Sequence, residues 1–190
     1  MSEAAQTLEG WFALHDFRTI DWTAWKQADA AERERGESEL RRMMNEWAAI
    51  EEAKNGSTAV YAIVGQKADI LFMHLRETLE ELQELETAFN KSAFAEYALP
   101  AYSYVSVVEL SNYTAEPGTD PMQNPEIAAR LKPILPKTRH ICFYPMNKRR
   151  LGGDNWYMLP IDQRREMMRA HGMTGRKYAG KVRQIVTGSV

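Results

Sequence analysis

Apolar side chains recur with two different periodicities along the first 113 residues. Residues 30–54 place them every three or four positions, which predicts an amphipathic helix that Asn55-Gly56 ends. A similar stripe begins at Thr78 and predicts a second helix. Runs rich in β-branched, aromatic or alternating apolar residues predict four strands, at residues 11–17, 58–64, 68–75 and 102–110.

The resulting order, β-α-β-β-α-β, is typical of the α+β ferredoxin-like fold, an antiparallel sheet with both helices on one face. The pattern then restarts. A strand is predicted at residues 140–146, a helix at 160–171 ended by Gly172 and Gly175, and a strand at 182–186. We therefore expect two ferredoxin-like halves, the second of them incomplete in this chain.

The region between the two halves is rich in proline. Five of the eight prolines fall in residues 114–137, which argues against a long regular element there. We expect an N-terminal half at residues 1–113, a linker loop at 114–137 and the start of a C-terminal half at 138–190. Half a sheet leaves an edge unpaired, so we expect a longer polypeptide or a second chain to supply the rest. A shorter appendage is the alternative.

Overall composition excludes some classes of function. The net charge of −2 creates no general field for nucleic acid or anionic membranes. The single cysteine, Cys142, cannot form an internal disulfide, and no apolar run reaches the ~20 residues that span a bilayer. The first residues carry no basic-then-apolar signal pattern, so we expect a cytoplasmic protein.

The segment after residue 140 holds the densest set of reactive side chains. Strand alternation would place Tyr144, Met146 and Lys148 on one face, just before Arg149-Arg150. One interpretation is a solvated basic turn at a strand end. The other is a site for an anionic, largely apolar ligand, with a phenol able to donate a hydrogen bond or take part in redox chemistry. Cys142 falls on the same face, and a small buried hydrophobe is its ordinary role.

Two later residues are further candidates. His171 follows Met167 and Met168 by one helical turn, so it is either a cation suited to a helix end or an imidazole able to bind a heme iron. On the last strand, Gln184 would share a face with two valines and Arg183 would face the other way. That amide is either buried against backbone or poised above a metal-bound ligand. We expect His15 and His74 to pack or bond locally.

Several motifs together resemble the coproheme decarboxylases of the chlorite dismutase superfamily. The resemblance extends over essentially the whole chain and is carried by the combination of motifs rather than by any one. The matching runs are EGWF at residues 9–12, the segment 102–113, YPMNKRR at 144–150, DNWYMLP at 154–160, HG at 171–172 and YAGKV at 178–182.

The resemblance implies a role for each candidate. His171 would be the proximal iron ligand and Tyr144 the tyrosine that becomes a radical. Lys148 would sit beside a reacting propionate, and Met146 would line the pocket. Arg130 and Tyr113 would hold propionates, and Gln184 would be the distal glutamine, while Trp156 receives no firm role. These residues would form a heme pocket in the second half of a subunit.

The implied reaction uses hydrogen peroxide to convert iron coproporphyrin III, or coproheme, into heme b by oxidative loss of two carboxyl groups. The porphyrin would be both substrate and redox centre. A homopentamer is implied, with coproporphyrin ferrochelatase as a donor of substrate. The family's second half normally continues beyond residue 190, which puts porphyrin binding in question if nothing replaces that part.

Three other functions compete with this prediction. A chlorite dismutase relies on a distal arginine, and Gln184 occupies that position here. A heme carrier or sensor would use the same pocket but would have no need of an oxidisable phenol at Tyr144. A structural protein of this fold would bind no porphyrin at all.

Overall fold

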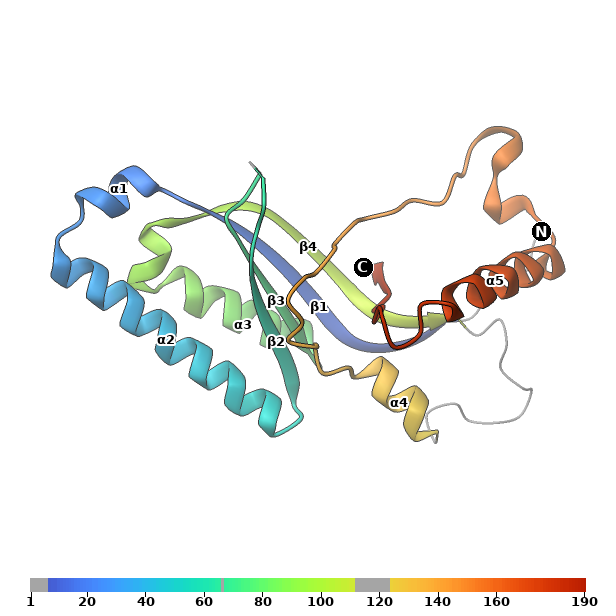
Figure 1. Ribbon diagram of the computed structural model, residues 1–190, viewed down its shortest axis with the longest axis horizontal. Helices are drawn as coiled ribbons and strands as arrows, with labels where there is room; N and C mark the ends of the chain where they lie inside the picture. Colours follow the sequence, from blue (N-terminus) through green and yellow to red (C-terminus); the bar gives the residue numbers. More distant parts are fainter. Residues whose placement is uncertain (1–6, 66, 112–123) are drawn as a thin grey trace.

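The computed structural model describes residues 7–65, 67–111 and 124–190, which form one antiparallel sheet with helices at its side and end (Figure 1). Its five strands lie in the order β2-β3-β1-β4-β5. The first four reproduce the ferredoxin-like arrangement, so the predicted α+β fold class is confirmed. The strands are β1 (Thr7–Ile20), β2 (Gly56–Ala62), β3 (Ile70–Arg76), β4 (Ala98–Ser111) and β5 (Thr187–Ser189).

Two long helices, α2 (Ala30–Glu52) and α3 (Leu79–Asn90), cover one face of this sheet (Figure 1). Each begins with a capping box, in which Asp29 pairs with Glu32 and Thr78 with Glu81, so the free backbone N–H groups of the first turn are satisfied. The short helices α1 (Trp22–Gln27) and η1 (Ala93–Glu96) complete the connections.

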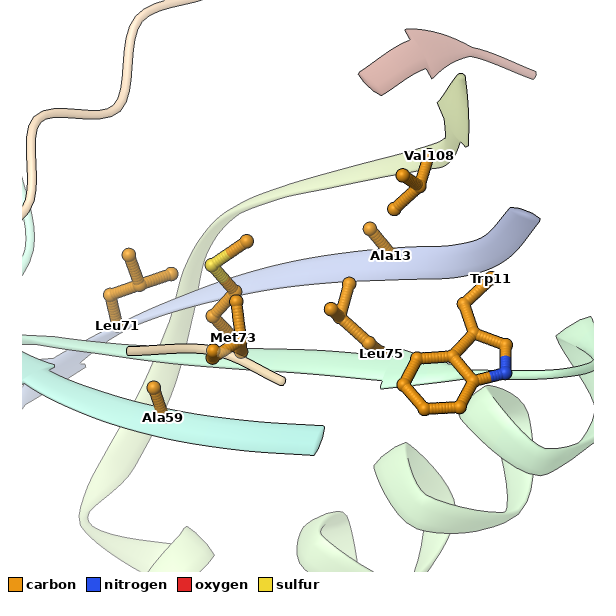
Figure 2. Close-up of a cluster of buried hydrophobic side chains, with 8 residues drawn as sticks. Trp11, Ala13, Ala59, Leu71, Met73, Leu75 and Val108 are labelled. Atoms are coloured by element: carbon orange, nitrogen blue, oxygen red, sulfur yellow. The ribbon is translucent and has the colours of Figure 1, made fainter. Parts of the chain in front are cut away.

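The sheet has an apolar layer on each side. Toward the helices, Phe72 packs with Ile20, Trp47 and Phe89. On the opposite face, the alternate residues of β3 join a second cluster, of which Figure 2 shows most members. That cluster consists of Trp11, Ala13, Ala59, Leu71, Met73, Leu75, Val108 and Leu135.

Leu135 reaches the second cluster from the linker, which crosses the face away from α2 and α3. The described part of the linker begins with helix α4 (Pro125–Leu131), which has an Asn124 cap and a proline in its first turn. A Cβ at position 10 would collide with the carbonyl oxygen of Leu131, so Gly10 lets α4 close against β1. The predicted linker loop therefore contains a short helix and is firmly packed where described.

Beyond the linker, several predictions for the second half are wrong. Residues 140–146 are extended but form no strand, and residues 182–186 are irregular, with β5 beginning only at Thr187. Helix α5 (Ile161–Arg176) begins where expected but continues through Gly172 and Gly175. The 3-10 helices η3 (Gly152–Asp154) and η4 (Trp156–Met158) precede it.

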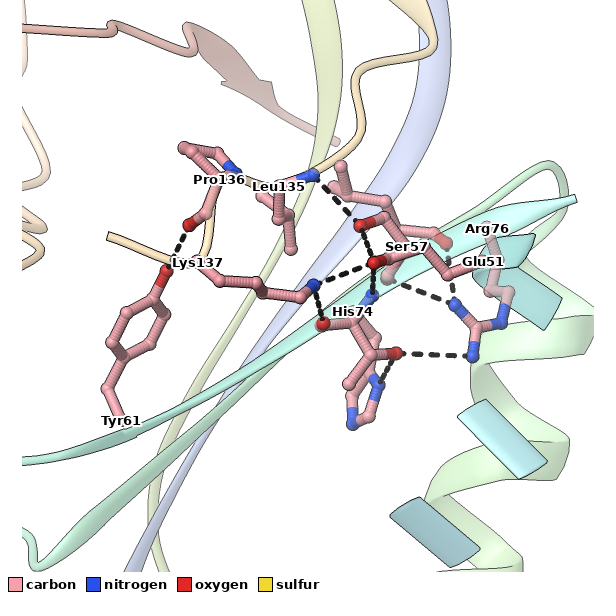
Figure 3. A network of polar contacts seen from close by, with 10 residues as sticks. Glu51, Ser57, Tyr61, His74, Arg76, Leu135, Pro136 and Lys137 are labelled. Atoms are coloured by element: carbon pink, nitrogen blue, oxygen red, sulfur yellow. Dashed lines mark hydrogen bonds and ion pairs between the residues drawn. The ribbon is translucent and has the colours of Figure 1, made fainter. Parts of the chain in front are cut away.

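A polar network fastens the linker to the sheet and to the end of α2 (Figure 3). One carboxylate oxygen of Glu51 accepts hydrogen bonds from the Ser57 hydroxyl, from the Thr58 N–H at 3.2 Å and from Lys137 Nζ at 2.7 Å. The Ser57 hydroxyl oxygen in turn accepts from the Leu135 N–H at 2.9 Å. A carboxylate in the last turn of a helix interacts unfavourably with the helix dipole. The ion pair with Lys137 offsets this unfavourable interaction of Glu51 at the end of α2.

Replacing Glu51 by Gln should lower the free energy of unfolding by about 1–2 kcal/mol, because charge-assisted hydrogen bonds are lost at a partly buried position. Although partial burial acts to raise the pKa of Glu51, the hydrogen bonds from Lys137, Ser57 and Thr58 hold it below its ordinary value. The stabilisation is therefore complete above about pH 4.3 and is lost as the pH falls through the lower pKa of the folded state.

Urea unfolding at pH 7 and at decreasing pH would measure both effects. Glu52→Gln, at the neighbouring exposed position, is the matched control and should change stability by less than about 0.5 kcal/mol. Equal effects of the two substitutions at pH 7, or a difference that persists in acid, would contradict the role assigned to Glu51.

Candidate functional site

The chain between Lys137 and Arg150 is extended and lies almost entirely in solvent. Tyr144 is 57% exposed and Met146 is 78% exposed, and neither side chain has a hydrogen bond within the described part of the chain. Cys142 is also exposed, so the expectation of a buried thiol is wrong. No neighbouring strand pairs with this segment among the described residues. Tyr144, Met146 and Lys148 therefore do not form one face of a sheet, as had been predicted.

The basic end of this segment folds back on the two 3-10 helices. Lys148 Nζ lies 5.0 Å from the ring centroid of Trp156, within cation–π range. Arg149 forms an ion pair with Asp154 at 3.1 Å, and the Asn155 amide donates to the backbone carbonyl of Arg150. The run YPMNKRR stays exposed to solvent, as in the interpretation of a solvated basic turn, but its basic side chains contact the two 3-10 helices, and Lys148 lies over the Trp156 ring.

Helix α5 carries His171 on an exposed surface beyond the end of the sheet (Figure 1). The His171 side chain has no hydrogen bond or ion pair with any residue that the structure describes. Gly172 and Gly175 follow it within the helix, and a Cβ at either would meet nothing within 4 Å. Each glycine costs about 1 kcal/mol relative to alanine in a helix, with no packing inside the described chain to account for it. The helix backbone is therefore open at both glycines, and Gly175 lies one turn beyond His171.

Arg130 and Gln184 come together although 54 positions separate them in the sequence. Both line a small hollow of about 170 Å³ at β4, with Pro133 and residues 183–186 as its other walls. Arg183 lines the same hollow. Residues 182–186 form no strand, so the strand alternation that predicted opposite directions for Arg183 and Gln184 is absent. Gln184 is exposed, which also excludes the interpretation of a buried amide.

The remaining candidates fall into two groups. Tyr113 lies outside the described residues. The predicted local roles of two histidines are confirmed. His74 is buried and its Nδ1 lies 2.9 Å from the Thr58 hydroxyl. His15 is 3% exposed, and burial lowers its pKa to about 4, although a hydrogen bond with the Tyr104 backbone acts to raise it.

Sequence reasoning missed one aromatic cluster. Phe143 lies against His15, Phe17 and Tyr104, on the sheet face opposite α2 and α3. The only available signal was that His15 and Phe17 share one face of a predicted strand. This cluster stands beside a groove of about 670 Å³ between β2 and residues 137–143.

The described side chains limit the kinds of metal chemistry. Within residues 7–65, 67–111 and 124–190, no group of three His, Cys, Asp or Glu side chains could enclose a bare metal ion. A porphyrin iron needs only one axial ligand from the protein, and the open imidazole of His171 meets that requirement. The cations at positions 130 and 148 suit carboxylates on such a ligand. No helix in the described ranges is long and apolar enough to cross a membrane.

A protein of known structure is similar to this chain over nearly its whole length. The chain is 48% identical to a protein from Thermus thermophilus described as a novel heme-binding protein, with a TM-score of 0.94. The match covers 99% of this chain and 75% of that one.

More distant structures share the fold. A protein provisionally classed as a chlorite dismutase, TA0507, is 18% identical with a TM-score of 0.65, over 96% of this chain and 73% of its own. A variant of chlorite dismutase from Candidatus Nitrospira defluvii is 17% identical with a TM-score of 0.56, over 90% and 66%. The family model described as chlorite dismutase matches residues 33–190. The chain therefore belongs to the chlorite dismutase family.

Proposed function

We propose that this protein binds iron coproporphyrin III and, with hydrogen peroxide, removes two of its propionate carboxyl groups to yield heme b. The observation that carries the proposal is the exposed set of Tyr144, Lys148 and His171, in a chain 48% identical to a heme-binding protein. An oxidisable phenol, a cation and an open imidazole are the groups that this reaction requires.

The binding roles follow from the chemistry of the side chains. His171 would coordinate the iron, with Gly172 and Gly175 allowing a flat ring to approach the helix backbone. Arg130, Lys148 and Tyr113 would hold propionates by charge and hydrogen bonds. Met146 would offer an apolar contact, and Gln184 would be the polar group on the distal side. The iron supplies the redox chemistry with peroxide when the substrate is bound.

Tyr144 would carry the reaction at the propionate. Its phenol loses a hydrogen atom, and the resulting tyrosyl radical takes a hydrogen atom from the propionate β-carbon. Loss of one further electron and of carbon dioxide leaves a vinyl group. Each propionate thus gives up two electrons, which is what one peroxide accepts in becoming water, so two peroxides are needed for heme b. Lys148 would keep the reacting carboxylate ionised and in place.

A titration with iron coproporphyrin III, followed by absorbance, tests the proposal. Stepwise addition of hydrogen peroxide should then lower the porphyrin mass by two carboxyl groups, with completion near two equivalents. Binding without loss of mass would overturn the decarboxylase and favour the second candidate, a heme carrier or sensor. That candidate is supported by the heme-binding description of the Thermus thermophilus relative.

Three associated expectations stay predictions. We expect a homopentamer, a ferrochelatase as the source of coproheme, and a cytoplasmic location. Sedimentation of the purified protein with and without porphyrin would test the first of these.

A further inference from the structure

Phe143 is the one side chain between Lys137 and Arg150 that is not exposed. Its ring stacks on His15, with centroids 4.3 Å apart and an interplanar angle of 28°. Phe17 and Tyr104 flank the same ring at 5.5 Å and 6.0 Å between centroids. Phe143 therefore anchors the extended segment against the sheet immediately before Tyr144.

The side chains that form this aromatic seat for Phe143, those of His15, Phe17 and Tyr104, lie on the paired strands β1 and β4. His15 and Phe17 lie two positions apart on β1 and so face the same side, and His15 pairs in register with Tyr104 on β4. Burial keeps the His15 imidazole neutral near pH 7, because its pKa falls to about 4. A neutral ring can stack on Phe143 without the cost of burying a charge.

The anchor also determines the direction of the next side chain. In an extended chain, successive side chains point to opposite sides. When Phe143 points into the aromatic seat, Tyr144 must point away from it, and Tyr144 is accordingly 57% exposed. Without the Phe143 contact, neither the position nor the direction of the Tyr144 phenol would be fixed.

We propose that Phe143, seated on His15, is a positioning residue that fixes where the Tyr144 phenol meets the porphyrin. This inference rests on the proposed function of Tyr144. Phe143 touches no substrate in this role and acts only through its neighbour. The reaction then depends also on the packing of Phe143 against His15 on the N-terminal sheet.

The mobility of a nitroxide spin label on Cys142, the only cysteine in the sequence, and steady-state kinetics with iron coproporphyrin III and peroxide test this role together. Phe143→Ala and His15→Ala should each shorten the rotational correlation time of this label about threefold in porphyrin-free protein. Each should lower kcat about tenfold and leave KM within about threefold, because the porphyrin contacts remain. The double variant should be no worse than either single one, since both remove the same contact.

Two further variants keep the test specific. His15→Phe preserves a ring under Phe143 and should keep both label mobility and kcat near those of the unmodified protein, whereas Ile141→Ala, an exposed change in the same segment, should alter neither. Unchanged label mobility in Phe143→Ala, normal kcat in that variant, or equal effects of Ile141→Ala would overturn the positioning role. Absence of turnover in the unmodified protein would overturn the proposed function instead, so the two failures are distinguishable.

Discussion

Replacing Tyr144 by Phe should abolish decarboxylation while leaving porphyrin binding unchanged. The phenol O–H is the hydrogen-atom source that the reaction needs, and Phe removes only that group. We expect kcat to fall by at least about a hundredfold, because no other described side chain stands in the same position to replace the radical. The affinity for coproheme should stay within about threefold, since Tyr144 supplies neither the iron ligand nor a propionate cation.

The matched control is Tyr178→Phe. Tyr178 is also 57% exposed, so the two substitutions remove equivalent phenols and differ only in position. Mass analysis of the porphyrin after two equivalents of peroxide would compare them. Full conversion by Tyr144→Phe, or equal loss in both variants, would show that the radical does not form at Tyr144.

Much of the N-terminal sheet could be predicted from the sequence because its signals are local. The caps at Asp29 and Thr78 mark where α2 and α3 begin, and period-two alternation in β3 separates its two buried faces. Both kinds of signal lie within a few residues of the element they define. The predicted strands are confirmed to within a few residues, although β1 and β4 run longer at both ends.

The second half was predicted less well because its signals depend on distant partners. A β-rich run such as residues 140–146 becomes a strand only when a neighbour supplies the hydrogen bonds, and none pairs with it among the described residues. Glycine ends a helix when it adopts a left-handed backbone, and neither Gly172 nor Gly175 does so. Helix α5 ends instead at Arg176, with Lys177 as a right-handed C-cap.

The candidate site shows the same division between local and distant information. Residue chemistry singled out Tyr144, Lys148 and His171 as candidate site residues, and the structure places all three at exposed positions, while their roles stay predictions. Their surroundings could not be predicted, because the Phe143–His15 stack joins residues 128 positions apart and the hollow shared by Arg130 and Gln184 depends on where the linker packs. The porphyrin titration tests whether the protein binds the ligand on which Tyr144, Lys148 and His171 are proposed to act.

A buried ion pair on β1 supports the sheet that carries this site. Arg18 and Asp16 are 2% and 5% exposed, and they lie two positions apart on the face toward α3. Arg18 Nη2 is 2.7 Å from one Asp16 carboxylate oxygen, and Nε donates to the other at 2.8 Å. The guanidinium also lies 4.8 Å from the ring centroid of Phe89, on α3. The pair thus ties β1 to the helix layer.

Replacing Asp16 by Ala should lower the free energy of unfolding by about 3–5 kcal/mol, because it leaves the Arg18 cation buried without its partner. Urea unfolding would measure the loss. Glu46→Ala removes the partner of Arg42 from an ion pair of similar length whose side chains are 63% and 56% exposed, and it should cost less than about 1 kcal/mol. Because the penalty arises from the uncompensated charge, the double variant Asp16→Leu with Arg18→Met should recover most of the stability. A small loss in Asp16→Ala would show that the sheet does not depend on this pair, and no recovery in the double variant would show that the penalty does not come from an uncompensated charge.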